Sequence, residues 1–215
     1  MPGLEVDFCG INLLLLPQKA VFIEKEKSLL IADPHFGKSG HFRQSGIPVS
    51  GLVQLEDLER LSHLISETSA ERLFILGDFF HAQPNHEWLL WCEWLKIHSG
   101  LQVLLVPGNH DKHILKLEFP AQMQCTSMQY NLDNISLSHD ETEADFPLIC
   151  GHIHPSVYVT GAGKQGLKMP CFYMKQRTLI LPAFGSFTGT FKISATRGER
   201  VFIPVNNQVI EIKTT

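Results

Sequence analysis

Side chains that bind divalent metals are concentrated in a few short motifs along this sequence. In chain order these are Asp33-Pro34-His35, Gly77-Asp78, Gly108-Asn109-His110-Asp111, His139 and Gly151-His152-Ile153-His154. Imidazole and carboxylate or amide oxygens suit Mn, Fe and Zn, and none of the motifs contains a thiolate. The residue types therefore predict a hydrolytic metal site rather than a structural one.

Most of these motifs directly follow a short apolar run that predicts a β-strand. The runs cover residues 29–32, 73–76, 103–106 and 148–150. In open sheets of α/β proteins, ligands bind beyond the carboxyl ends of the strands, where loops from distant parts of the chain meet. We therefore expect one bimetallic site that is assembled from loops.

The spacing of the motifs suggests a role for each candidate metal ligand. Asp33 and His35 are two positions apart and can point the same way as the chain leaves a strand. Asp78 can bridge two cations through its two oxygens, at the separation of ~3.5–4 Å that is typical of two-metal phosphoesterases. Asn109 adds a neutral amide oxygen, which keeps the cluster positive enough to attract a phosphate. The remaining candidate ligands are His139, His152 and His154.

The first half of the chain predicts strands that alternate with helices. Residues 13–16, 21–23 and 28–32 read as antiparallel strands, and residues 72–76 and 102–106 as further strands. Leucines recur at helical spacing from residue 52 to residue 64, and a second helix is expected over residues 87–98. Its tryptophans, at positions 88, 91 and 94, share one face, which favours a core role over a base-stacking surface. This βαβαβ order predicts a parallel sheet.

The second half is mostly β. After Lys116 we expect strands over residues 135–138, 148–150, 157–160, 171–174, 178–181, 191–194, 200–203 and 209–212. No linker separates the halves, and the last metal motif must meet the first if the site exists. We therefore expect residues 1–215 to form a single domain.

Composition limits the classes of function. The chain has 215 residues, of which 44% are hydrophobic, and a formal charge of −4, so it lacks the basic surface of a general nucleic-acid binder. Any contact with DNA must be local. No apolar run approaches the ~20 residues that span a bilayer, and the basic segment of a secretory signal is missing. We expect a cytoplasmic protein that does not bind membranes.

The ordered motifs resemble those of the calcineurin-like metallophosphoesterase superfamily, whose pattern is D-x-H, GD, GNH[DE], H and GHxH. The resemblance implies an α/β fold, a four-layer αββα sandwich of two mixed β-sheets. It also implies two sets of ligands that share Asp78. One set is Asp33, His35, Asp78 and His154, and the other is Asp78, Asn109, His139 and His152. In this family pattern His110 is not a ligand. It would protonate the leaving group or stabilise developing charge, and Asp111 would orient its ring.

Further strings are similar to the DNA-ligase-associated metallophosphoesterases of bacteria. They cover residues 32–38, 42–48, 77–81 and 182–189, although Pro34 and Phe36 stand where members often carry Leu. This resemblance implies a manganese-dependent phosphodiesterase or endonuclease that acts on DNA during repair, with a DNA ligase, a helicase and an exonuclease as partners. Zn²⁺ and Fe²⁺ are also compatible with the ligands. Arg43 and His81 are expected to contact the substrate.

Two other functions compete with DNA cleavage. A phosphodiesterase for small nucleotides, such as cyclic ones, fits the acidic composition slightly better, whereas single-stranded DNA or DNA ends suit a nuclease without a broad basic surface. A scaffold that has lost catalysis is disfavoured, because the candidate ligands and His110 are all present.

Overall fold

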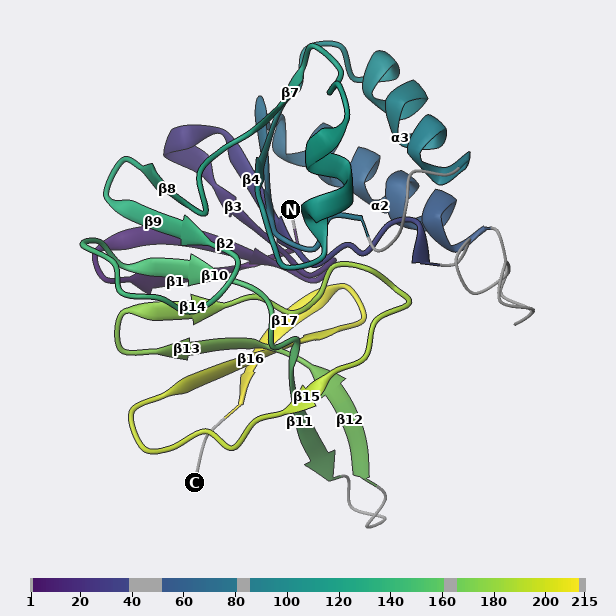
Figure 1. Ribbon diagram of the computed structural model, residues 1–215. Helices are drawn as coiled ribbons and strands as arrows, with labels where there is room; N and C mark the ends of the chain where they lie inside the picture. The colour runs from purple at the N-terminus through teal and green to yellow at the C-terminus, as the bar shows by residue number, and fades with distance from the viewer. Residues whose placement is uncertain (1, 39–51, 81–85, 161–165, 213–215) are drawn as a thin grey trace.

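The computed structural model describes residues 2–38, 52–80, 86–160 and 166–212 (Figure 1). A first mixed sheet holds seven strands in the spatial order of the chain. They are β1 (Leu4–Phe8), β2 (Ile11–Leu16), β3 (Ala20–Ile23), β4 (Ser28–Ala32), β5 (Arg72–Leu76), β6 (Gln102–Val106) and β7 (Met123–Cys125). The strands from β4 to β7 are parallel, and the others are antiparallel. The predicted parallel sheet is confirmed, with β1 and β7 added at its edges.

A second sheet of seven strands faces the first. Its spatial order is β17 (Gln208–Ile212), β16 (Arg200–Val205), β13 (Phe172–Lys175), β14 (Thr178–Ile180), β10 (Leu148–Cys150), β9 (Ile135–Ser138) and β8 (Gln129–Leu132). β10 is parallel to both of its neighbours, so this sheet is also mixed. The two sheets enclose a buried apolar layer to which Leu30, Phe74 and Leu104 contribute from one side and Leu137 and Ile149 from the other. The expected sandwich of two mixed sheets is confirmed.

Helices cover the outer face of the first sheet. α2 (Val53–Thr68) and α3 (His86–Ile97) pack their apolar sides on this face, while η1 (Glu24–Glu26) and η2 (Asp111–Lys116) are short 3₁₀ turns. The tryptophans Trp88, Trp91 and Trp94 are 9%, 0% and 7% exposed, as expected for core residues. Within the described ranges, no helix combines the length and the apolar character needed to cross a bilayer.

The outermost layer on the other side is a small sheet rather than helices. It consists of β12 (Gly166–Pro170), β11 (Pro155–Thr160) and β15 (Phe191–Lys192), and it packs on the second sheet through residues such as Val157, Met169 and Ile193. Along the described part of the chain after η2 we find strands and loops only. In the described residues, the fourth layer of the expected αββα arrangement is therefore a small β-sheet instead of helices, because short apolar strands cover the second sheet on this side.

Candidate two-metal site

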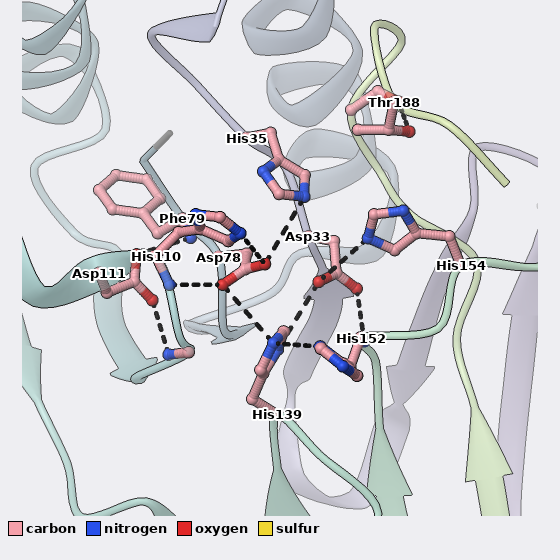
Figure 2. Close-up of polar contacts among 12 residues, drawn as sticks. Asp33, His35, Asp78, Phe79, His110, Asp111, His139, His152, His154 and Thr188 are labelled. Atoms are coloured by element: carbon pink, nitrogen blue, oxygen red, sulfur yellow. Dashed lines mark hydrogen bonds and ion pairs between the residues drawn. The ribbon is translucent and has the colours of Figure 1, made fainter. Parts of the chain in front are cut away.

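The candidate ligands lie in loops at the carboxyl ends of parallel strands from both sheets (Figure 2). Asp33 directly follows β4, Asp78 lies two residues after β5, and His139 directly follows β9. His152 and His154 follow β10. The sandwich brings these strand ends together, as expected from the order of the motifs.

Six of the candidate ligands form two clusters. Asp33, His35 and His154 make the first cluster, and Asp78, His139 and His152 make the second, with the ligand atoms of each cluster within 4.8 Å of one another. The clusters adjoin, because His139 Nδ1 lies 3.6 Å from Asp33 Oδ1 and His35 Nε2 lies 3.8 Å from Asp78 Oδ2. Two divalent ions could therefore be held side by side.

The buried polar atoms of the first cluster fit a cation. Asp33 Oδ1 and His154 Nε2 are buried, and within the described residues neither has a hydrogen-bond partner, although the two atoms are 3.4 Å apart. Leaving such groups without a partner costs free energy in a protein interior. A metal ion between the carboxylate and the imidazole would satisfy both atoms.

Neighbouring backbone carbonyls orient two of the imidazoles. His139 Nδ1 lies 3.2 Å from the carbonyl oxygen of Leu76, and His154 Nδ1 lies 3.0 Å from that of Gly189. A histidine whose one ring nitrogen donates to a carbonyl presents the other nitrogen, unprotonated, to a metal. Burial lowers the pKa of His154, but the interactions with Asp33, the carbonyl of Gly189 and Asp78 together raise it overall.

The backbone of the site is strained. Five candidate ligands have a positive φ, which is uncommon for residues other than glycine. These are Asp33 (50°), His35 (48°), Asp78 (45°), His152 (70°) and His154 (49°). Sharp turns at the strand ends aim these side chains into one space, and the surrounding contacts hold the turns in place.

Two glycines of the motifs allow loops to approach the ligands closely. A Cβ atom on Gly77 would lie 2.1 Å from His139 Nδ1, and one on Gly151 would lie 2.5 Å from Asp33 Oδ2. Any larger residue at either position would displace a ligand. The glycines that precede Asp78 and His152 are thus part of the site geometry.

Asp111 connects two of the motif loops through backbone hydrogen bonds. Its carboxylate is fully buried and accepts backbone N–H groups of Gly108 at 2.7 Å, Phe79 at 2.9 Å and Phe80 at 3.2 Å. Burial raises the pKa of this carboxyl to about 6, against the opposing effect of these hydrogen bonds. The described contacts of Asp111 therefore join the second and third motif loops, and they do not include the ring of His110. Orientation of the His110 ring by Asp111 stays a prediction.

His110 lies at the open side of the clusters. Its side chain is 52% exposed, its Nε2 is 3.9 Å from Asp78 Oδ2, and its backbone N–H donates to Asp78 Oδ1 at 3.0 Å. A partly exposed imidazole beside the Asp78 carboxylate can reach a substrate that enters from solvent. Asn109 is exposed, and none of its described contacts joins its side chain to either cluster. Arg43 and His81 lie outside the described residues.

Asp140 was not identified from the sequence. Its Oδ1 lies 3.3 Å from His152 Nδ1, which also approaches His139 Nε2 at 3.0 Å. Asp140 follows His139 directly, so its carboxylate next to a candidate ligand was the sequence feature that could have identified it.

A clamp from α2 was also missed. Asp57 Oδ1 accepts a hydrogen bond from Ser186 Oγ at 2.6 Å and pairs with Arg60 at 2.8 Å, while Arg60 donates to the carbonyl oxygen of Phe184 at 2.6 Å. These contacts hold residues 182–189, the loop that orients His154 through Gly189. In the sequence, Asp57 and Arg60 look like residues on the solvent-exposed face of an amphipathic helix.

Two adjoining clusters of carboxylates and imidazoles, at the strand ends of a two-sheet sandwich, define a metal-dependent phosphoesterase. Residues 27–170 match the family model described as calcineurin-like phosphoesterase, and the chain belongs to this family. It is therefore a hydrolase that depends on divalent metal ions. Among the curated proteins, no sequence matches significantly.

One solved structure of a similar protein agrees with this assignment along nearly the whole chain. The crystal structure of Pseudomonas putida nuclease MPE is 30% identical, with a TM-score of 0.81, and the match covers 97% of this chain and 100% of the nuclease. An Aquifex aeolicus protein of unknown function, AQ665, is 21% identical, with a TM-score of 0.42 over 59% of this chain and 78% of its own.

Proposed function

We propose that this protein hydrolyses phosphodiester bonds in DNA, at single strands or ends. The observation that carries the proposal is the pair of adjoining ligand clusters, whose buried Asp33 and His154 atoms fit a cation. The similarity to a nuclease along nearly the whole chain supports a nucleic acid as the substrate.

The proposed ligands divide between two ions. Asp33, His35 and His154 would hold one ion, and His139, His152 and the amide of Asn109 would hold the other, with Asp78 available to both. Mn²⁺ is the proposed metal, because it accepts both imidazole and carboxylate ligands. When bound, two such ions supply Lewis-acid chemistry and activate water for attack on phosphorus.

The residues of the chain position the reacting groups. Asp111 and the clamp of Asp57 and Arg60 fix the loops that carry the ligands. His110 is the proposed general acid, because its exposed imidazole can give a proton to the leaving alkoxide. Arg43 and His81 stay proposed contacts to the substrate.

The wider biological role follows from the resemblance to ligase-associated phosphoesterases. We propose a cytoplasmic role in DNA repair beside a ligase, a helicase and an exonuclease. We also propose that residues 1–215 act as one domain, which the hydrogen bond between the backbone of His152 and Asp33 supports because it joins the two halves.

Turnover of three substrates tests the function. A chromogenic phosphodiester, its phosphomonoester and a labelled single-stranded oligonucleotide are each incubated with Mn²⁺, with and without EDTA. We expect the diester and the oligonucleotide to be cleaved only with metal. Cleavage of the diester alone would move the substrate to small nucleotides, and no cleavage with any divalent metal would favour a scaffold.

His110→Ala separates catalysis from metal binding. We expect kcat for the diester to fall by about 10²–10⁴-fold while the bound metal content stays the same. Undiminished turnover would overturn the role of His110.

A further inference from the structure

The charge of this chain is distributed unevenly. Residues 151–198 contain six Lys or Arg and no Asp or Glu, although the whole chain carries a formal charge of −4. This stretch begins with the last metal motif and continues into the small sheet of β11, β12 and β15. Two of these cations, Lys168 on β12 and Lys192 on β15, belong to the small sheet, so a polyanion that extends from the metal site along this sheet meets favourable charge there.

The small sheet extends directly from the site. β11 begins at Pro155, next to His154, and the backbone N–H of Phe191 in β15 donates to the carbonyl oxygen of His154 at 2.9 Å. Figure 1 shows β11 and β12 projecting away from the two large sheets. The strand thus leads outward from a candidate ligand.

One face of this sheet combines an aromatic ring with two lysines. Tyr158 is 56% exposed, and Lys168 stands directly opposite it on β12. Lys192 on β15 pairs with Ser156, two positions before Tyr158, and its Nζ lies 5.6 Å from the centre of the tyrosine ring. Cross-strand partners and residues two positions apart share a face, so the three side chains lie together. We call Tyr158, Lys168 and Lys192 the β11 face.

The opposite side of β11 explains why these residues are exposed. Val157 and Val159 alternate with Tyr158 and pack with Met169 of β12 on the second large sheet. Lys168 is exposed, and its Nζ donates to the carbonyl oxygen of Thr190, which places the ammonium between β12 and β15. The core thus fixes the orientation of the β11 face and directs it to solvent.

We propose that the β11 face binds a single-stranded polynucleotide beyond the scissile bond. This inference rests on the proposed function and deepens it. Proteins bind single strands with aromatic rings that stack on bases and with cations that contact phosphates, which is the chemistry of this face. Tyr158 lies four residues after His154, or ~13 Å along an extended strand at ~3.3 Å per residue. At a rise of ~3.4 Å per stacked nucleotide, this spans about four nucleotides.

Binding without cleavage tests the face. The dissociation constant of a fluorescein-labelled single strand of about 20 nucleotides is measured by fluorescence anisotropy in EDTA, where the site is metal-free. We expect Tyr158→Ala to weaken binding about tenfold and Tyr158→Phe to stay within about twofold of the wild type, because the ring that stacks is kept.

The contribution of Lys192 is tested by reversing its charge. Lys192→Glu should weaken binding more than tenfold. Lys192→Ala should make the negative slope of log association constant against log salt concentration shallower by about 0.7. Lys96→Glu is the control, because Lys96 is an exposed lysine on α3 and does not belong to the β11 face. It changes the net charge equally and should alter binding less than about threefold.

Turnover of the small chromogenic diester with Mn²⁺ is measured on the same variants. It should equal that of the wild type, because the diester is too short to reach Tyr158. Wild-type affinity in both Tyr158→Ala and Lys192→Glu, or no binding of the strand by the wild type, would overturn the inference even if the diester is cleaved. If the wild-type protein cleaves no substrate but Tyr158→Ala still weakens binding of the strand, only the proposed function is overturned.

Discussion

The backbone N–H of His152 donates a hydrogen bond to Asp33 Oδ2 at 2.9 Å. The two residues are 119 positions apart and come from different sheets. One oxygen of Asp33 thus fixes the last motif, while the other faces the imidazoles of His139 and His154. The halves of the chain are therefore joined at the site itself.

Gly151 allows this contact, so Gly151→Ala should disrupt it. The added methyl group would lie 2.5 Å from Asp33 Oδ2 and 2.6 Å from the Cβ of Ala32. We expect metal affinity to fall more than about tenfold and the free energy of unfolding to fall by about 1–3 kcal/mol. Metal titration and urea denaturation measure the two effects. Gly100→Ala is the control, because a Cβ there meets nothing within 4 Å; equal behaviour of the two variants would contradict the account.

Metal removal should lower thermal stability. Asp33 and Asp78 are buried and lie 3.6 Å and 3.5 Å from the same imidazole, His139. Saturating Mn²⁺ should raise Tm by about 5 °C or more, since a ligand at 100 times its Kd contributes about 2.7 kcal/mol.

Asp78→Asn should reduce that metal-dependent rise to less than about 2 °C. The metal-free variant should unfold at or above the Tm of the metal-free wild type, because the substitution removes a buried negative charge. Differential scanning calorimetry with and without EDTA measures both values. An undiminished metal effect in Asp78→Asn would remove this residue from the ligand set.

The α2 clamp should contribute to stability and to the geometry of His154. Asp57 and Arg60 have side chains that are 4% and 23% exposed, and Asp57→Asn leaves Arg60 without its buried carboxylate. We expect the free energy of unfolding to fall by about 3 kcal/mol and metal affinity to fall about tenfold. Glu93→Gln breaks an exposed pair with Lys96 and should cost less than about 0.5 kcal/mol. Equal losses in the two variants would show that the clamp contributes no more than an exposed ion pair.

Lys19 should make stability depend on pH in the alkaline range. Burial lowers the pKa of its ammonium from 10.5 to about 8, and its Nζ donates to the carbonyl oxygen of Gly185 at 3.3 Å. Between these values the unfolded chain binds more protons than the folded one, so this group makes stability rise with pH. From pH 7.5 to pH 9.5, the wild type should gain on the order of 1 kcal/mol relative to Lys19→Met. Parallel pH profiles of the two proteins would contradict the assignment.

Local patterns predict most of what surrounds the ligands. Each metal motif is contiguous and follows a strand, so residues 29–32 and 73–76 predicted both β4 and β5 and the place where Asp33 and Asp78 would lie. The buried helical face of α2 was equally visible, because its leucines repeat at helical spacing.

Features that depend on tertiary contacts were not visible in the sequence. Asp111 is next to His110, but its hydrogen bonds go to backbone N–H groups of Phe79 and Phe80, more than 30 positions away. Asp57 is buried by the loop that it binds. β12 was missed because much of it is exposed and it is held by pairing with β11, rather than by an apolar pattern of its own.

Anomalous X-ray diffraction at the Mn absorption edge, on crystals grown with Mn²⁺, tests the central claim most directly. We expect two peaks ~3.5–4 Å apart, one among Asp33, His35 and His154 and one among His139, His152 and Asp78. A single peak, or peaks away from both clusters, would contradict a two-metal phosphoesterase site.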